Sequence, residues 1–145
     1  MPGWLSLPRQ RELVQACRRW AAGPVPMRRV RMPGGRFMSV RTVCLGWHWQ
    51  PYRYSRTADD AGGRPMTPVV SLSLGDSCLF RFGTPLSRGR PYTDLELASG
   101  DLFVFGGPSR LAYHGVPKVY PGTADPALGM GGGRLNITLR VSGLS

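Results

Sequence analysis

Apolar side chains recur at helical spacing near the start of the chain. The repeat joins these positions: Leu13, Ala16, Cys17 and Trp20. Pro8 suits a first helical turn, and Gly23 with Pro24 is a stop signal. The spacing therefore predicts one amphipathic helix, and its exposed face carries these arginines: Arg9, Arg11, Arg18 and Arg19.

After this helix the apolar repeat changes to two, which is typical of strands. The pattern predicts strands over residues 37–43, 69–74, 78–82, 93–97, 102–105, 110–116 and 135–141. We expect Gly75-Asp76-Ser77 to close a hairpin between two of them, and Gly100-Asp101 to close another. This arrangement predicts a mainly β domain with one N-terminal helix, either a sandwich or a jelly roll.

Two stretches lack either repeat. Residues 55–68 and 117–133 are rich in glycine and proline, so both are expected to be loops. The second is longer than an ordinary connection, and we therefore expect it to be a functional or mobile excursion.

The last predicted strand alternates without a fault between apolar and polar residues. One face carries Leu135, Ile137, Leu139 and Val141, and the other carries Arg134, Asn136, Thr138 and Arg140. In a jelly roll the polar face turns toward the central cavity, where arginines need anions. The two arginine Cα atoms would lie roughly 20 Å apart, so only inward-leaning side chains could hold both ends of a dicarboxylate. A solvated edge strand is the alternative.

Positive charge dominates the composition. The chain has 19 Lys and Arg against 8 Asp and Glu, a formal net charge of +11. Nucleic acid is the commonest partner of proteins with such an excess of positive charge. The alternative interpretation is an arginine-rich surface that is only solvated.

The three cysteines, Cys17, Cys44 and Cys78, stand far apart and form neither a zinc motif nor a disulfide framework. No apolar run approaches the roughly 20 residues that span a bilayer, and the start lacks a signal-peptide pattern. We therefore expect a cytoplasmic protein with no membrane partner.

Several segments, in this order along the chain, resemble the motifs of AlkB-type oxygenases. They are Pro33-Gly34-Gly35 with Met38-Ser39-Val40, Leu45-Gly46-Trp47, Tyr52-x-Tyr54-Ser55, Val70-Ser71-Leu72-Ser73-Leu74-Gly75, Gly100-Asp101-Leu102-x-Val104-x-Gly106-Gly107, Ser109-Arg110-Leu111-x-Tyr113-His114-Gly115 and Arg134-x-Asn136-x-Thr138-x-Arg140. The resemblance covers nearly the whole chain, which makes it more specific than any one motif.

The resemblance implies an iron(II)- and 2-oxoglutarate-dependent dioxygenase on a double-stranded β-helix, or jelly roll. Such an enzyme removes alkyl groups oxidatively from nucleobases of DNA or RNA, as in DNA repair. His114 would be the distal iron ligand. Arg134 and Arg140 would bind the carboxylates of 2-oxoglutarate, with Asn136 assisting.

The same resemblance implies a surface for nucleic acid, expected to be single-stranded or base-flipped DNA. Trp47, Tyr52 and Tyr54 match the family's nucleotide-recognition lid, and core packing is the alternative reading of these rings. Arg53, Arg88 and Arg90 are the candidate phosphate contacts.

The family's H-x-D iron motif should lie shortly before Val69, and it is missing. The chain has two histidines, His48 and His114, and neither begins such a motif. We therefore expect a single domain over residues 1–145, internally truncated near residues 62–68, with an incomplete double-stranded β-helix.

A chain with one recognisable iron ligand is expected to be inactive, because the iron site of this chemistry needs two imidazoles and a carboxylate. A substitute triad of His48, His114 and either Asp59 or Asp60 is the alternative, although ligands must be held very accurately. We predict no catalytic residue beyond the metal site. A non-catalytic, basic nucleic-acid-binding module is the second hypothesis, and an unstable remnant the third.

Overall fold

The computed structural model describes residues 1–23, 26–32, 34–45, 48–50, 53–55 and 68–140. Two compact units make up the chain. The first unit contains Met1–Val14 and Arg64–Val141, and the second contains Gln15–Gly63 and Ser142–Ser145. Helix α1 (Leu7–Ala21) begins in the first unit and ends in the second.

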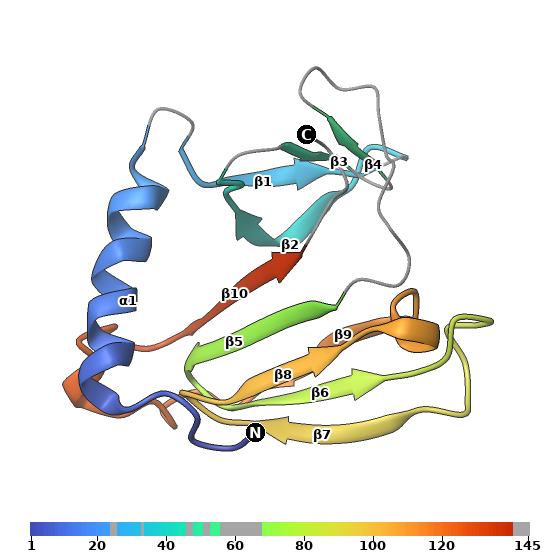
Figure 1. Cartoon of the computed structure of the whole chain (residues 1–145). Coiled ribbons are helices and arrows are strands. Elements are labelled where there is room, and N and C mark those ends of the chain that lie inside the picture. The colour runs from blue at the N-terminus through green and yellow to red at the C-terminus, as the bar shows by residue number, and fades with distance from the viewer. Residues whose placement is uncertain (24–25, 33, 46–47, 51–52, 56–67, 141–145) are drawn as a thin grey trace. The chain divides into compact units, whose positions relative to one another are not determined.

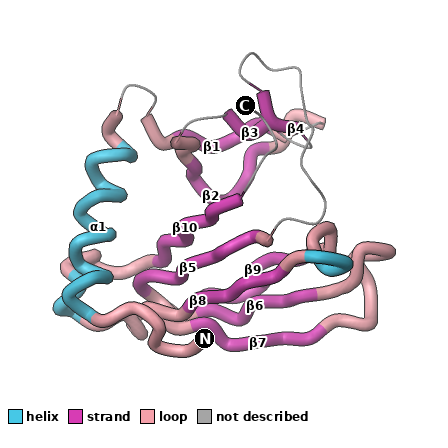
Figure 2. The backbone as a smooth tube through the Cα atoms, in the orientation of Figure 1, coloured by secondary structure: helices cyan, strands magenta, loops and turns pink. Residues whose placement is uncertain are grey.

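Two antiparallel sheets form the first unit, with strand orders β10-β5-β8 and β7-β6-β9 (Figures 1 and 2). Their strands are β5 (Val69–Gly75), β6 (Cys78–Phe82), β7 (Thr93–Leu97), β8 (Leu102–Phe105), β9 (His114–Val119) and β10 (Arg134–Arg140). The predicted class, mainly β with one N-terminal helix, is confirmed.

The two expected hairpins are wrong, although the strands beside them are correctly placed. β5 pairs with β10 and β8, whereas β6 pairs with β7 and β9. The Gly75-Asp76-Ser77 turn and the Gly100-Asp101 turn are therefore corners at which the chain passes from one sheet to the other. Gly75 and Gly100 have φ of +89° and +86°, the left-handed conformation that favours glycine.

The first half of helix α1 packs against β5 and β10 through a small apolar core. Val14, Leu74 and Leu128 are its buried members. Partly buried apolar residues pack around them: Leu5, Leu7, Leu13, Met130, Leu135 and Ile137. The buried stripe of the helix runs through Gln10 and Val14, so the expectation that Trp20 lies on it is wrong, since Trp20 is 37% exposed.

The predicted apolar face of β10 is confirmed at Leu135 and Ile137 but not at its far end. Leu139 is 63% exposed. Val141 lies outside the described residues.

Residues 117–133 are not the structureless excursion that their composition suggested. β9 extends to Val119, a 3₁₀ helix spans Pro126–Leu128, and the Leu128 side chain is 3% exposed. The carboxylate of Asp76, which is itself 3% exposed, accepts backbone N–H groups of Thr123, Ala124 and Gly133 at 3.0, 3.0 and 2.9 Å. One corner residue thus holds both ends of the loop.

The predicted start of β9 is wrong. Residues 110–116 were expected to be a strand, yet Gly107–Ser109 is a 3₁₀ helix and β9 begins only at His114. Gly107, with φ of +56°, begins the 3₁₀ helix, and the Arg110 amide donates to the Gly107 carbonyl oxygen at 3.0 Å.

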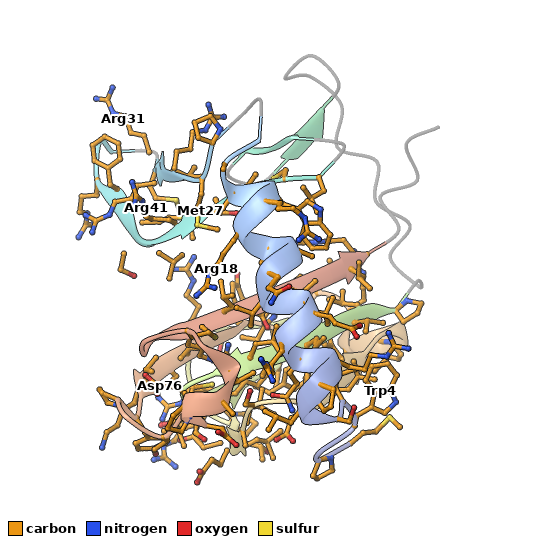
Figure 3. The ribbon with its side chains drawn as sticks, turned by 90° about the vertical axis from the view of Figure 1, so that its left-hand side faces the viewer. Trp4, Arg18, Met27, Arg31, Arg41 and Asp76 are labelled. Atoms are coloured by element: carbon orange, nitrogen blue, oxygen red, sulfur yellow. The ribbon has the colours of Figure 1, made fainter. Side chains whose placement is uncertain are left out.

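The second unit contains two antiparallel hairpins. β1 (Arg28–Arg31) pairs with β2 (Phe37–Thr42), and β3 (His48–Gln50) pairs with β4 (Arg53–Ser55). β2 confirms the strand predicted from residue 37, whereas the other three strands were not predicted. Arg31 and Arg41 project from the first hairpin and are exposed (Figure 3). Among the described residues, no helix combines the length and apolar character that crossing a membrane requires.

We predict that Asp76→Asn lowers the free energy of unfolding at neutral pH, because an amide nitrogen would then face backbone N–H donors. Backbone N–H groups, that of Ala124 first, hold the pKa of Asp76 below its ordinary value. A lowered pKa means that the carboxylate stabilises the fold above its unfolded-state pKa of about 3.9 and that this contribution is lost as pH falls through the folded-state pKa.

Chemical denaturation between neutral and acid pH measures this effect. The difference between the native chain and Asp76→Asn should shrink as the solution is acidified. Glu96→Gln removes the same charge from an exposed position of β7 and is the matched control, with little expected change at neutral pH. Equal losses in the two variants would remove Asp76 from its structural role.

Candidate functional site

The register of β10, β5 and β8 puts the predicted cosubstrate residues on one face of their sheet, here called the inner face. Cross-strand partners share a face, and Asn136 lies opposite Ser73, Thr138 opposite Ser71, and Ser71 opposite Phe103. The Phe103 ring packs on Phe80 of β6, with ring centroids 5.0 Å apart. The inner face therefore looks toward the β7-β6-β9 sheet.

Arg134 and Asn136 are fixed on the inner face by the serines of β5. Arg134 Nη2 donates to Ser73 Oγ at 2.9 Å, and Ser71 Oγ donates to Asn136 Oδ1 at 2.8 Å. The Asn136 amide also donates to Thr138 Oγ1 at 2.7 Å. These bonds hold the polar side chains in defined orientations.

Arg140 lies at the opposite end of β10 from Arg134, and its neighbours on the adjacent strands lead to the candidate iron ligand. Arg140 is opposite Val69, and Val69 is opposite Phe105. The Phe105 ring in turn contacts the His114 ring, with centroids 4.9 Å apart. The sequence-predicted residues Arg140 and His114 are thus brought to the same end of the inner face.

His114 begins β9, and its ring packs among phenylalanines. Phe80, Phe82 and Phe105 lie with ring centroids 6.0, 6.3 and 4.9 Å from it. Its Nδ1 is 2.8 Å from the carbonyl oxygen of Ala112. Because a carbonyl only accepts, Nδ1 is the donor in this hydrogen bond, and Nε2 is the ring nitrogen left for a metal.

The residues of the inner face suit a dicarboxylate. Arg134 is half-buried, and its Nε is a buried donor for which no hydrogen-bond partner exists among the described residues. A buried unpaired donor costs free energy, which an arriving carboxylate oxygen would recover. The donor set thus fits the carboxylate of 2-oxoglutarate.

The described residues do not supply a complete set of ligands for an iron ion. Within the described ranges, no cluster of three or more His, Cys, Asp or Glu residues could hold a metal. His48 lies in β3 of the second unit, and Asp59 and Asp60 lie outside the described residues, so the substitute triad stays untested.

The predicted nucleic-acid contacts are distributed over both units. Trp47 and Tyr52 lie outside the described residues, whereas Arg53 and Tyr54 are in β4 of the second unit. Arg88 and Arg90 are exposed on the loop between β6 and β7 of the first unit.

Sequence reasoning missed two contributions to the site. Ser71 and Ser73 hold the cosubstrate residues, and the alternation of the Val-Val-Ser-Leu-Ser-Leu segment could have revealed this, since its serines share one face. The aromatic cluster around His114 had a comparable signal in Phe80, Phe82, Phe103 and Phe105, which alternate along β6 and β8.

Comparison with known proteins identifies the family and the fold. Residues 58–140 match the model of the 2OG-Fe(II) oxygenase superfamily, which is more than half of the chain. The solved structure titled "The structure of OsALKBH1" superposes with a TM-score of 0.78 at 22% identity, over 97% of this chain and 96% of that one. The fold is therefore the jelly roll of these dioxygenases, and its described part has three strands in each sheet of the first unit.

The chain belongs to the 2OG-Fe(II) oxygenase superfamily. Within it, the chain is similar to proteins of the AlkB type. It is 50% identical over 76 residues to the "Alpha-ketoglutarate-dependent dioxygenase AlkB homolog" of Caulobacter vibrioides (strain NA1000 / CB15N), and 41% identical over 76 residues to "Alpha-ketoglutarate-dependent dioxygenase AlkB" of Escherichia coli (strain K12). Each match covers 52% of this chain, and the chain spans only 33% of each relative's length.

We predict that the affinity for 2-oxoglutarate falls about tenfold or more in Arg140→Ala, because losing a hydrogen bond to a charged group costs about 1.5–3 kcal/mol. Calorimetric titration with 2-oxoglutarate measures the change. Arg11→Ala, which removes an exposed arginine from α1, is the control and should bind as the native chain does. An unchanged affinity in Arg140→Ala would remove this arginine from the site.

Proposed function

We propose that this chain is a single AlkB-type dioxygenase domain for the oxidative dealkylation of nucleobases in DNA or RNA, internally truncated near residues 62–68 and inactive as it stands. One observation carries the proposal. Strand β10 carries Arg134, Asn136 and Arg140 on the inner face. The cross-strand neighbours of Arg140 are Val69 and then Phe105, whose ring contacts His114.

Each assigned residue has a role that its contacts support. Arg134 and Arg140 bind the carboxylates of 2-oxoglutarate, and Asn136 contributes its amide. His114, with its proton held on Nδ1 by the Ala112 carbonyl, offers Nε2 as the distal iron ligand. The missing H-x-D pair removes the other ligands, and we therefore propose that the chain retains cosubstrate binding without turnover.

Nucleic acid is the proposed partner. Relatives carry the names "DNA N(6)-methyladenine demethylase ALKBH1C" in Arabidopsis thaliana and "tRNA demethylase abh1" in Schizosaccharomyces pombe. The net charge of +11 supports the same class of partner here. We propose single-stranded or base-flipped DNA as the ligand, in the cytoplasm, with Trp47, Tyr52 and Tyr54 at the base and Arg53, Arg88 and Arg90 at phosphates.

The second candidate function is a non-catalytic module that binds nucleic acid. The exposed Arg88 and Arg90 favour it, because their contacts with phosphate would not depend on an iron site. Affinity for oligonucleotides in a chain that has no measurable affinity for 2-oxoglutarate would support this candidate over the truncated enzyme, which retains cosubstrate binding.

We predict that binding to a single-stranded oligonucleotide weakens steeply as salt concentration rises. Each lost phosphate contact should reduce the slope of log K against log salt by about 0.7 for a single strand. Arg88→Ala and Arg90→Ala should each show this reduction in fluorescence anisotropy titrations. Arg9→Ala is the control, since Arg9 Nη1 is already 2.7 Å from Glu12 Oε2. A salt-independent affinity would refute nucleic acid as the ligand.

We predict that the chain forms succinate from 2-oxoglutarate no faster than free iron(II) does, because His114 is the one recognisable ligand of the required three. Insertion of a segment bearing H-x-D between Arg64 and Pro68 should restore both metal affinity and succinate formation. A matched insertion with alanine at both ligand positions is the control. Turnover by the unmodified chain that is lost in His48→Ala would establish the substitute triad instead.

A further inference from the structure

Two loops of the first unit meet beside His114 and form one exposed surface, here called the Tyr113 platform. It comprises residues 83–92, between β6 and β7, and residues 107–113, before β9. Both lie at the end of the sheets away from α1 (Figure 1). Two backbone hydrogen bonds join the loops. The Gly83 amide donates to the Tyr113 carbonyl at 2.8 Å, and the Tyr113 amide donates to the Thr84 carbonyl at 3.1 Å.

The Tyr113 ring is the accessible aromatic group of this surface. It is 43% exposed, although the Arg88 guanidinium already lies 5.4 Å from its centroid. Exposed apolar side chains accompany it, Leu111 at 67% and Leu86 at 93%. Exposed aromatic and apolar groups that cluster on one surface are typical of a binding site.

Tyr92 is on the same surface but is already covered. Arg81 lies 3.8 Å and Arg90 lies 5.1 Å from its ring centroid, and Tyr92 is half-buried. Tyr113 is therefore the ring that has room for a ligand.

The charge of the platform selects an anionic ligand. Its two segments and Arg81 beside them contain four arginines, Arg81, Arg88, Arg90 and Arg110, and no acidic residue. Arg81 is neutralised by Asp94, with bonds of 2.7 Å from Nε to Oδ1 and from Nη2 to Oδ2. Arg88 and Arg90 are exposed on this surface, Arg88 near the Tyr113 ring and Arg90 near the Tyr92 ring, where Asp94 offsets part of the Arg90 charge. The two arginines supply the positive field of the platform.

We propose that the Tyr113 ring is a stacking site for an unpaired base of single-stranded nucleic acid whose neighbouring phosphates contact Arg88 and Arg90. This inference rests on the proposed function and adds to it a base-binding residue outside the lid segment. An aromatic ring can stack on any base, and a flexible guanidinium beside it can contact the neighbouring phosphate. A duplex is excluded as the preferred ligand, because the faces of its bases are covered by their neighbours.

The test is oligonucleotide binding by Tyr113→Ala. Affinity for a single strand should fall about tenfold with an unchanged salt slope, because stacking releases no counterions. Tyr120→Ala is the matched control, since the Tyr120 ring also carries a cation, Lys118 Nζ at 4.9 Å, but lies outside the platform. It should bind as the native chain does.

Two further variants distinguish stacking on the aromatic ring from simple apolar contact. Tyr113→Phe keeps the aromatic face and should retain affinity, whereas Tyr113→Leu keeps the apolar volume and should lose as much as the alanine variant. A single strand containing 2-aminopurine should show fluorescence quenching on the native chain and much less on Tyr113→Leu, which covers the case in which the alanine variant does not fold.

The proposal is overturned if Tyr113→Leu and Tyr113→Ala bind as tightly as the native chain, if Tyr113→Phe loses as much as they do, or if a duplex binds as well as a single strand. Salt-dependent binding that persists with an unaffected Tyr113→Ala would overturn the stacking site alone. Binding that is absent from the native chain would instead overturn the proposed function.

Discussion

A single buried carboxylate at the corner between two sheets is the constraint on which the rest of the first unit depends. Asp76 accepts amides from Thr123, Ala124 and Gly133, and its own amide donates to the Gly133 carbonyl at 2.8 Å. Backbone donors converging on one charged acceptor form strong hydrogen bonds. They convert a glycine-rich loop, whose ordering costs much conformational entropy, into a fixed connection between β9 and β10.

This corner determines the position of the cosubstrate strand. Gly133 is bonded to Asp76, and the next residue, Arg134, opens β10 opposite Gly75. Gly75 has no room for a side chain there, because an added Cβ would contact the Gly133 carbonyl oxygen. A shift of one residue in this register would turn Asn136 and both arginines away from the inner face. The placement of the polar residues on β10 is therefore a consequence of a carboxylate that lies outside the candidate site.

How far the sequence predicts this structure depends on the range of the interactions. Strands with clear alternation, such as β5, β6 and β10, could be placed to within about a residue, because the period-two pattern is local. The strands that pair with β5 and β6 could not be predicted, because a turn with glycine and aspartate suits a hairpin and a corner between sheets equally. β1 has the sequence Arg-Arg-Val-Arg, in which one apolar residue gives no period to detect. Asp76 looked like a turn residue because its partners lie about fifty positions away.

The candidate site divides in the same way between local and distant signals. The proposed 2-oxoglutarate-binding residues lie on one strand, so one alternating segment predicted all of them, whereas an iron site draws its ligands from separate parts of the fold. An internal truncation near residues 62–68 would therefore affect the two functions unequally. Dicarboxylate binding would keep its arginines and the serines that orient them, while the metal would lose two ligands at once. On the proposed function, the chain would retain the recognition of anions, cosubstrate and phosphate alike, without the oxidative chemistry.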